Sequence, residues 1–116
     1  MNLPVQYTPG SGLNSFADKA DQFLRGEDTP SNFLDRCIAS INTQEPEVKA
    51  WVTTRLDAVQ AEAKTADRRY ASGTPLSPVD GMPIGIKDVI QTRDMPTKFG
   101  SPIFDNYETG FDSASV

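Results

Sequence analysis

The sequence predicts an α/β fold, in which a helix connects two parallel strands of one sheet. Three observations support this fold class. Small apolar residues alternate with polar or aromatic ones over 48–54, a stretch that includes β-branched side chains. An alanine-rich helical pattern follows over 56–70. An apolar run then begins after the Asp80-Gly81 turn signal. Strand, helix, loop and strand in this order are typical of a parallel pair joined by a right-handed crossover.

Two helices are predicted before the first strand. Over 13–25, apolar side chains recur at the spacing of one helix face, and Gly26 ends the pattern. A second helix is predicted over 30–42, because Thr29-Pro30 supplies a cap and a first turn and Pro46 is expected to stop it. The two apolar faces comprise Leu13, Phe16, Ala17, Ala20, Phe23 and Leu24, then Phe33, Leu34, Cys37, Ile38 and Ile41.

The strand, helix and loop of the crossover come next. Residues 48–54 are predicted to form a short strand, in which Trp51 is assigned to packing rather than to a ligand site. Residues 56–70 are predicted to form a helix with one apolar and one solvated, charged side. Residues 72–80, rich in glycine and proline, are the loop that leads to the second strand.

Lys87 interrupts the apolar stretch from Met82 to Ile90, which otherwise indicates a strand buried on both faces. An unpaired ammonium is costly to bury, so this lysine must either turn to solvent or meet polar groups in a pocket. The isolated pattern favours the outward orientation. In open α/β sheets, however, functional groups gather at the carboxyl ends of strands, where Lys87 is expected to lie.

Composition and charge limit the functions that the chain can have. Its 116 residues are 37% hydrophobic and 23% charged, which suffices for one small domain and not for two. A net charge of -5 without a basic patch argues against direct nucleic-acid binding. Because the chain has one cysteine and no histidine, it offers neither an internal disulfide nor a Cys/His metal site, and a reduced, intracellular protein is predicted.

The first residues lack the pattern of a targeting segment. Residues 1–12, with two prolines and two glycines, are predicted to form an extended or mobile arm, and residues 13–116 to belong to a single domain. No run approaches the roughly 20 apolar residues of a membrane span. A cytoplasmic protein without membrane contact is therefore expected.

The residues around Lys87 also carry a family resemblance. They read Gly-Met-Pro-Ile-Gly-Ile-Lys-Asp over 81–88, then Pro-Thr-Lys-Phe-Gly-Ser over 96–101 and Asp-Ser-Ala-Ser-Val over 112–116. In order and approximate spacing, residues 79–116 closely resemble the start of the amidase signature family. The resemblance implies the N-terminal portion of a mixed β-sheet with helices packed on both faces. One departure is Lys98, where the family often has a second threonine.

The same resemblance implies a reaction and a role for Lys87. Family members cleave a carboxamide C–N bond through an acyl-serine intermediate, using a lysine, a cis-serine and a serine nucleophile. The resemblance identifies Lys87 as the base of this triad and implies no metal or organic cofactor. The serines are expected beyond Val116, so the chain is expected to be truncated before them and inactive alone. The expected partners are a small amide substrate and the remainder of the same polypeptide, with homo-oligomerisation left open.

The chemistry explains why a lysine can serve as this base. A serine hydroxyl is a poor nucleophile until an adjacent group takes its proton. Burial disfavours the charged form of lysine, so a desolvated lysine beside polar hydroxyls can accept that proton. The role of Lys87 therefore requires a pocket that shields it from water in the complete active site.

Two other functions remain open at this point. The chain could be a non-catalytic binding or assembly module, in which the apolar faces of helices 13–25 and 30–42 pack on another subunit. It could also belong to a transamidating member of the family, resembling the A subunit of a tRNA-dependent amidotransferase that passes ammonia to a partner. The motif itself specifies a mechanism rather than a substrate.

Four further polar residues receive structural or subsidiary roles. Asp88 is expected to hydrogen bond in the turn that follows rather than to pair with Lys87. Cys37 is expected to act as a small buried hydrophobic residue, since no activating base is visible. Ser101 lies where it could approach the site without being a nucleophile, and Asp112 is expected to cap a helix beginning at Ser113.

Overall fold

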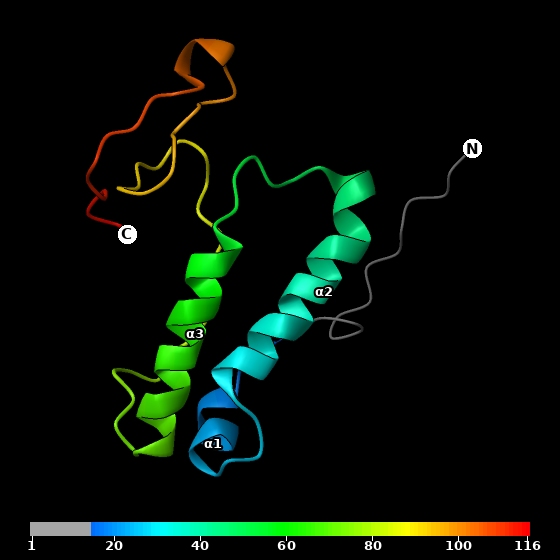
Figure 1. The fold of residues 1–116 in the computed structure, drawn as a ribbon, viewed down its shortest axis with the longest axis vertical. Helices are drawn as coiled ribbons and strands as arrows, with labels where there is room; N and C mark the ends of the chain where they lie inside the picture. The colour runs from blue at the N-terminus through cyan, green and yellow to red at the C-terminus, as the bar shows by residue number, and fades with distance from the viewer. Residues whose placement is uncertain (1–14) are drawn as a thin grey trace.

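The computed structural model describes residues 15–116 and shows helices joined by long irregular segments. The α-helices are α1 (Lys19–Leu24), α2 (Pro30–Val48) and α3 (Leu56–Ala71), and a short 3-10 helix, η1 (Pro102–Phe104), follows. Helices α2 and α3 lie side by side, with α1 at one end of the pair and residues 90–116 at the other (Figure 1). None of the described helices is long and apolar enough to cross a membrane. The predicted arm, residues 1–12, lies outside the described residues.

The start of α2 is fixed by caps from its own chain and from α3. Thr29 Oγ1 accepts a hydrogen bond from the Asn32 N–H at 3.1 Å, as the Thr29-Pro30 pair predicted. The Asp67 carboxylate, on α3, accepts from the Ser31 N–H at 2.9 Å and from the Ser31 hydroxyl at 2.5 Å. A negative charge at a helix N-terminus is favourable, so Asp67 both caps α2 and ties it to α3.

Helix α2 continues past the proline that was predicted to stop it. Pro46 lies inside the helix, which ends only at Val48, with Lys49 in a left-handed conformation donating its N–H to the Glu45 carbonyl at 2.9 Å. A proline removes one backbone donor but does not prevent the remaining carbonyls from being satisfied. The helix predicted over 56–70 is confirmed as α3, whereas α1 begins at Lys19, later than residue 13.

The core is a small aromatic cluster shared by all three α-helices. Phe23, Phe33 and Tyr70 are buried, and the rings of Phe23 and Tyr70 meet edge to face with centroids 5.1 Å apart. Phe16, Ala20 and Cys37 pack against this cluster. Part of each predicted apolar face is thus used inside the chain, although Leu24 of α1 remains 50% exposed.

The α/β prediction is wrong for residues 15–116, which contain no β-strand. In the first predicted strand, 48–54, Val48 ends α2 while Trp51 and Val52 are exposed. In the second, residues 82–87 are extended but unpaired, and Ile84 keeps 64% of its surface exposed. A strand exists only when a neighbouring strand accepts and donates its backbone hydrogen bonds. Alternating apolar residues and β-branched side chains favour a position in a sheet, but they do not provide the neighbouring strand.

Candidate active site

Lys87 lies at the end of the extended segment 82–87, which runs back alongside α3 from its C-terminal end (Figure 1). The Lys87 carbonyl accepts hydrogen bonds from the N–H groups of Val89, at 2.8 Å, and Ile90, at 2.9 Å, so the chain turns directly after the lysine. The Lys87 side chain is exposed, and no hydrogen bond or ion pair joins it to another residue of 15–116. Within residues 15–116, the Lys87 ammonium is therefore accessible to solvent and is not enclosed in a pocket.

Asp88 fastens the turn after Lys87 to a later loop. Its carboxylate accepts a hydrogen bond from the Lys98 N–H at 2.8 Å, and its carbonyl accepts from the Phe99 N–H at 3.1 Å. The expectation that Asp88 hydrogen bonds instead of pairing with Lys87 is confirmed. Its partner, however, lies in the loop at 96–101 rather than in the turn directly after it.

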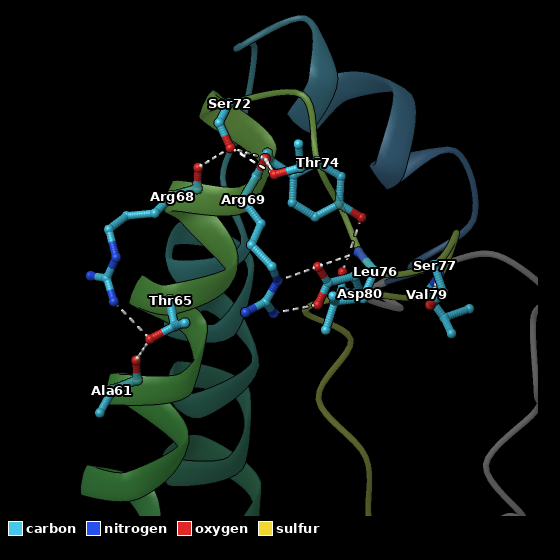
Figure 2. A network of polar contacts seen from close by, with 11 residues as sticks. Ala61, Thr65, Arg68, Arg69, Ser72, Thr74, Leu76, Ser77, Val79 and Asp80 are labelled. Carbon is cyan, nitrogen blue, oxygen red and sulfur yellow. Dashed lines mark hydrogen bonds and ion pairs between the residues drawn. The ribbon is translucent and has the colours of Figure 1, made fainter.

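Asp80 anchors the chain on the side before Lys87, and Figure 2 shows its contacts with Arg69. Its carboxylate receives two hydrogen bonds from the guanidinium of Arg69, on α3: Nε to Oδ2 at 2.7 Å and Nη2 to Oδ1 at 2.5 Å. The Leu76 N–H donates to Oδ2 at 3.1 Å, and the Tyr70 hydroxyl donates to the Asp80 carbonyl at 3.0 Å. A two-pronged arginine contact fixes direction as well as distance, so Asp80 has a defined orientation on α3.

The electrostatics of this anchor follow from its partners. Hydrogen bonding from Arg69 is the main cause that lowers the pKa of Asp80, and it outweighs the opposing effect of burial. Burial raises the pKa of the adjacent Tyr70 hydroxyl, and the charge of Asp80 raises it further. Both groups are therefore held in the protonation states that the contacts require, an ionised carboxylate and a neutral phenol.

The Asp80 anchor is expected to make the chain less stable in acid. Because the folded-state pKa of Asp80 lies below its unfolded value of about 3.9, its stabilisation is present above that pH and is lost as the pH falls through the lower folded value. Urea unfolding at pH 6 and pH 3 should show a steeper loss for the wild type than for Asp80→Asn. Asp28 and Asp112, whose pKa values are also lowered, are present in both proteins, so the difference reports Asp80. Equal losses would contradict this assignment.

Two glycines let the segment lie close to the helical pair. A Cβ at Gly81 would lie 2.9 Å from Pro30 Cβ and 3.2 Å from Ala66 Cβ, and the φ of Gly81 is +79°. A Cβ at Gly85 would lie 3.0 Å from Cη2 of Trp51. Trp51 is partly exposed and packs against the Lys87 segment, which agrees with the predicted packing role. The segment therefore touches the start of α2 at Gly81 and the loop between α2 and α3 at Gly85.

The remaining polar residues singled out in the sequence take structural places. Cys37 is half-buried against the aromatic core, and burial raises the pKa of its thiol, which keeps it protonated. The Ser101 N–H donates to the Lys98 carbonyl, and no hydrogen bond joins Ser101 to Lys87 among the described residues. Asp112 accepts from the Arg93 N–H at 2.8 Å and from Arg93 Nε at 2.6 Å. The predicted helix cap at Asp112 is wrong, because residues 113–116 form a turn.

The pairing of Arg69 with Asp80 is not visible in the sequence. Nothing in the sequence distinguishes Arg69 from the other charged residues of the predicted helix. The sequence likewise identifies Asp80 only as part of a turn. The one signal present is the charge of Asp80 beside an apolar stretch, because a carboxylate is seldom buried unless it is paired. Its partner cannot be named without knowing that the chain doubles back over the end of α3.

The comparisons with known proteins cover most of the chain. Residues 32–116, which include Lys87, match the family described as Amidase. The chain is 40% identical over 91 residues to the A subunit of glutamyl-tRNA(Gln) amidotransferase from Chloroflexus aggregans, covering 78% of this chain and 19% of the relative. It is 36% identical over 102 residues to the subunit of that name in Roseiflexus sp. (strain RS-1), with 88% and 21% covered. The chloroplastic/mitochondrial subunit of Sorghum bicolor is 30% identical over 110 residues, with 93% and 20% covered. The chain thus spans about a fifth of the length of the curated relatives it matches.

Proposed function

Because the chain belongs to the amidase signature family, we propose that it carries the catalytic lysine, Lys87, of an enzyme resembling the A subunit of a tRNA-dependent amidotransferase. The observation that carries this proposal is the 36–40% identity to two bacterial relatives of that name over 78–88% of the chain. The family match also includes the stretch around Lys87. The family match supports the shared chemistry, and the names of the relatives supply the type of amide reaction.

In the proposed mechanism, Lys87 acts as the base that activates a serine. Neutral Nζ accepts the proton that leaves the serine hydroxyl, directly or through the second serine, as the oxygen bonds to the carboxamide carbon. The C–N bond then breaks, and ammonia leaves after taking up a proton from the lysine. Water finally cleaves the acyl-serine ester and releases the carboxylic acid.

The geometry of the described residues supports this role for Lys87. The segment is fastened by Asp80 on one side and by Asp88 on the other, while the ammonium itself is exposed. An exposed ammonium on an anchored backbone is accessible to groups from elsewhere in the enzyme. We propose that the serines and the pocket that shields Lys87 from water belong to parts of the enzyme outside the 116 residues.

The amide donor distinguishes a transamidating enzyme from an independent hydrolase. The proposed amidotransferase component should release ammonia from glutamine, and more rapidly when partner subunits and glutamyl-tRNA are present. The test uses the natural polypeptide at full length, alone and with the subunits that copurify with it, and measures ammonia release from glutamine and from small aliphatic amides. Equal turnover of simple amides in all conditions would contradict the amidotransferase role.

That contrary result would favour a second candidate, a self-sufficient amide hydrolase. The family description, Amidase, supports this candidate because it names an enzyme that acts on an amide. The same lysine and the same acyl-serine chemistry would serve both functions. Absence of ammonia release from every amide would reject both.

A further inference from the structure

Lys87 is held from both sides: Asp88 fastens the turn after it, and the contacts before it lie at Asp80, Gly81 and Gly85. Residues 82–87 belong to no helix or strand, so their path is not held by a regular backbone ladder. The first fixed point is Asp80, bound to α3 through Arg69. A second is Gly81 against Pro30 and Ala66, and a third is Gly85 against the ring of Trp51.

We propose that Arg69 and Asp80 are positioning residues for Lys87, an inference that rests on the proposed function. The two side chains hold the point at which the chain leaves the loop 72–80 and starts toward the lysine. Asp80 is almost completely buried, with 8% of its surface exposed, and is satisfied by Arg69 and by the Leu76 N–H. The Asp80 carboxylate is 5% exposed and the Arg69 side chain 26% exposed, and their two-pronged contact fixes direction as well as distance.

The anchor controls direction because of where its hydrogen bonds act. Arg69 fixes the Asp80 side chain, while the Tyr70 hydroxyl fixes the Asp80 carbonyl, so side chain and backbone are both held. Gly81 follows immediately and lies against Ala66 of α3. Loss of the anchor therefore releases the chain from α3 just before residue 82, while Asp88 still holds the turn after Lys87. The lysine is then expected to shift relative to the groups it must reach. A displacement of about 1 Å can cost roughly a hundredfold in rate.

Asp28 provides a matched control for Asp80. It is also a largely buried carboxylate that accepts from an arginine, Arg36, and from a backbone N–H, that of Thr29 at 2.9 Å. Its contacts lie at the junction of α1 and α2 and include Lys19. Asp28→Asn thus removes the same kind of ion pair without touching the segment that carries Lys87.

Kinetics of the full-length polypeptide give the first readout. Asp80→Asn and Arg69→Leu are each expected to lower kcat for ammonia release by about tenfold to a hundredfold, with KM changed less than about twofold. The double variant should be no worse than either single one, since both remove the same contact. Arg69→Lys, which retains charge but not the two-pronged geometry, should restore part of the rate. Asp28→Asn should keep the wild-type kcat.

The position of the segment gives a readout that does not depend on activity. Gly85 lies against the Trp51 ring, so its Hα resonances should be displaced by the ring, and Trp51→Ala supplies the undisplaced values. In the 116-residue chain, Asp80→Asn should move the Gly85 shifts more than halfway to those values, and Asp28→Asn should leave them in place. If Asp80→Asn prevents folding, Asp80→Glu, which keeps the charge but moves it outward, is measured instead.

The outcomes separate this inference from the proposed function. Unchanged Gly85 shifts in a folded Asp80 variant, or a kcat equal to that of Asp28→Asn, would overturn the positioning role. Failure of the wild-type enzyme to hydrolyse any amide would instead overturn the proposed function. The Gly85 shifts would then decide by themselves whether Asp80 holds the segment.

Discussion

Replacing Lys87 by arginine in the full-length polypeptide is expected to lower kcat for amide hydrolysis by at least about a thousandfold. A general base contributes roughly 10² to 10⁴ in rate, and the serine also depends on it for activation. A guanidinium remains protonated throughout the accessible pH range and cannot accept the serine proton. The change preserves positive charge and approximate length, so a large loss of rate would identify proton transfer, rather than charge, as the function of Lys87.

Ammonia release under single-turnover conditions measures this effect most directly, because it separates chemistry from product release. Lys98→Arg is the matched control. Lys98 lies in the loop that Asp88 fastens, and its ammonium is 3.9 Å from the carboxylate of Asp105. Its replacement should leave kcat within about twofold, because arginine keeps the positive charge facing Asp105 and leaves the backbone N–H that binds Asp88 unchanged. A Lys87→Arg enzyme that retained about a tenth of the wild-type rate would rule out the base role.

Replacing Gly81 by alanine is expected to destabilise the 116-residue chain by about 2 to 4 kcal/mol. Two costs combine at this position. The new Cβ would lie 2.9 Å from Pro30 Cβ, in the first turn of α2, and 3.2 Å from Ala66 Cβ. The φ of +79° is in addition strained for any residue with a Cβ. Neither neighbour can yield easily, because Pro30 is a ring on the helix backbone and Ala66 is buried in the contact between α2 and α3.

Gly73→Ala separates these two costs. Gly73 has a similar φ of +70°, but a Cβ there would meet nothing within 4 Å. Gly73→Ala should therefore lower the free energy of unfolding only by the cost of the strained backbone, about 1 kcal/mol. Equilibrium urea unfolding of both variants gives the comparison. Equal losses at the two positions would show that the close approach of Gly81 to the helices contributes nothing to stability.

The helices could be predicted because their signals are local. The apolar periodicity over 56–70 corresponds to α3, and Thr29-Pro30 marks the first turn of α2. The extension of α2 past Pro46 could not be predicted, because it depends on two opposing free energies. Proline lacks one backbone N–H donor, and the additional helical residues must stabilise the helix by more than that loss. Local signals do not report that balance.

The strands could not be predicted correctly because strand formation depends on a partner. The pattern over 82–87 predicts a buried strand, whereas the structure shows a segment without helix or strand, because the pattern does not tell whether another strand lies beside it. Lys87 could be singled out because its motif consists of consecutive residues, and its catalytic role stays a prediction. Arg69 was missed because it meets Asp80 only where the chain reverses, and no sequence spacing encodes that meeting.

The order of the elements along the chain has a consequence for synthesis. The three α-helices and their aromatic core are complete by residue 71, and the core includes the contact of Phe23, on α1, with Tyr70, on α3. The contact between α2 and α3 requires closing only the short loop 49–55, which costs little chain entropy, so it is expected to form early. On the ribosome, the helical pair should therefore emerge first and fold before residues 80–88 follow. The segment that carries Lys87 would then pack onto helices that have already folded. Substitutions in the helices that slow their folding should therefore also slow the positioning of Lys87.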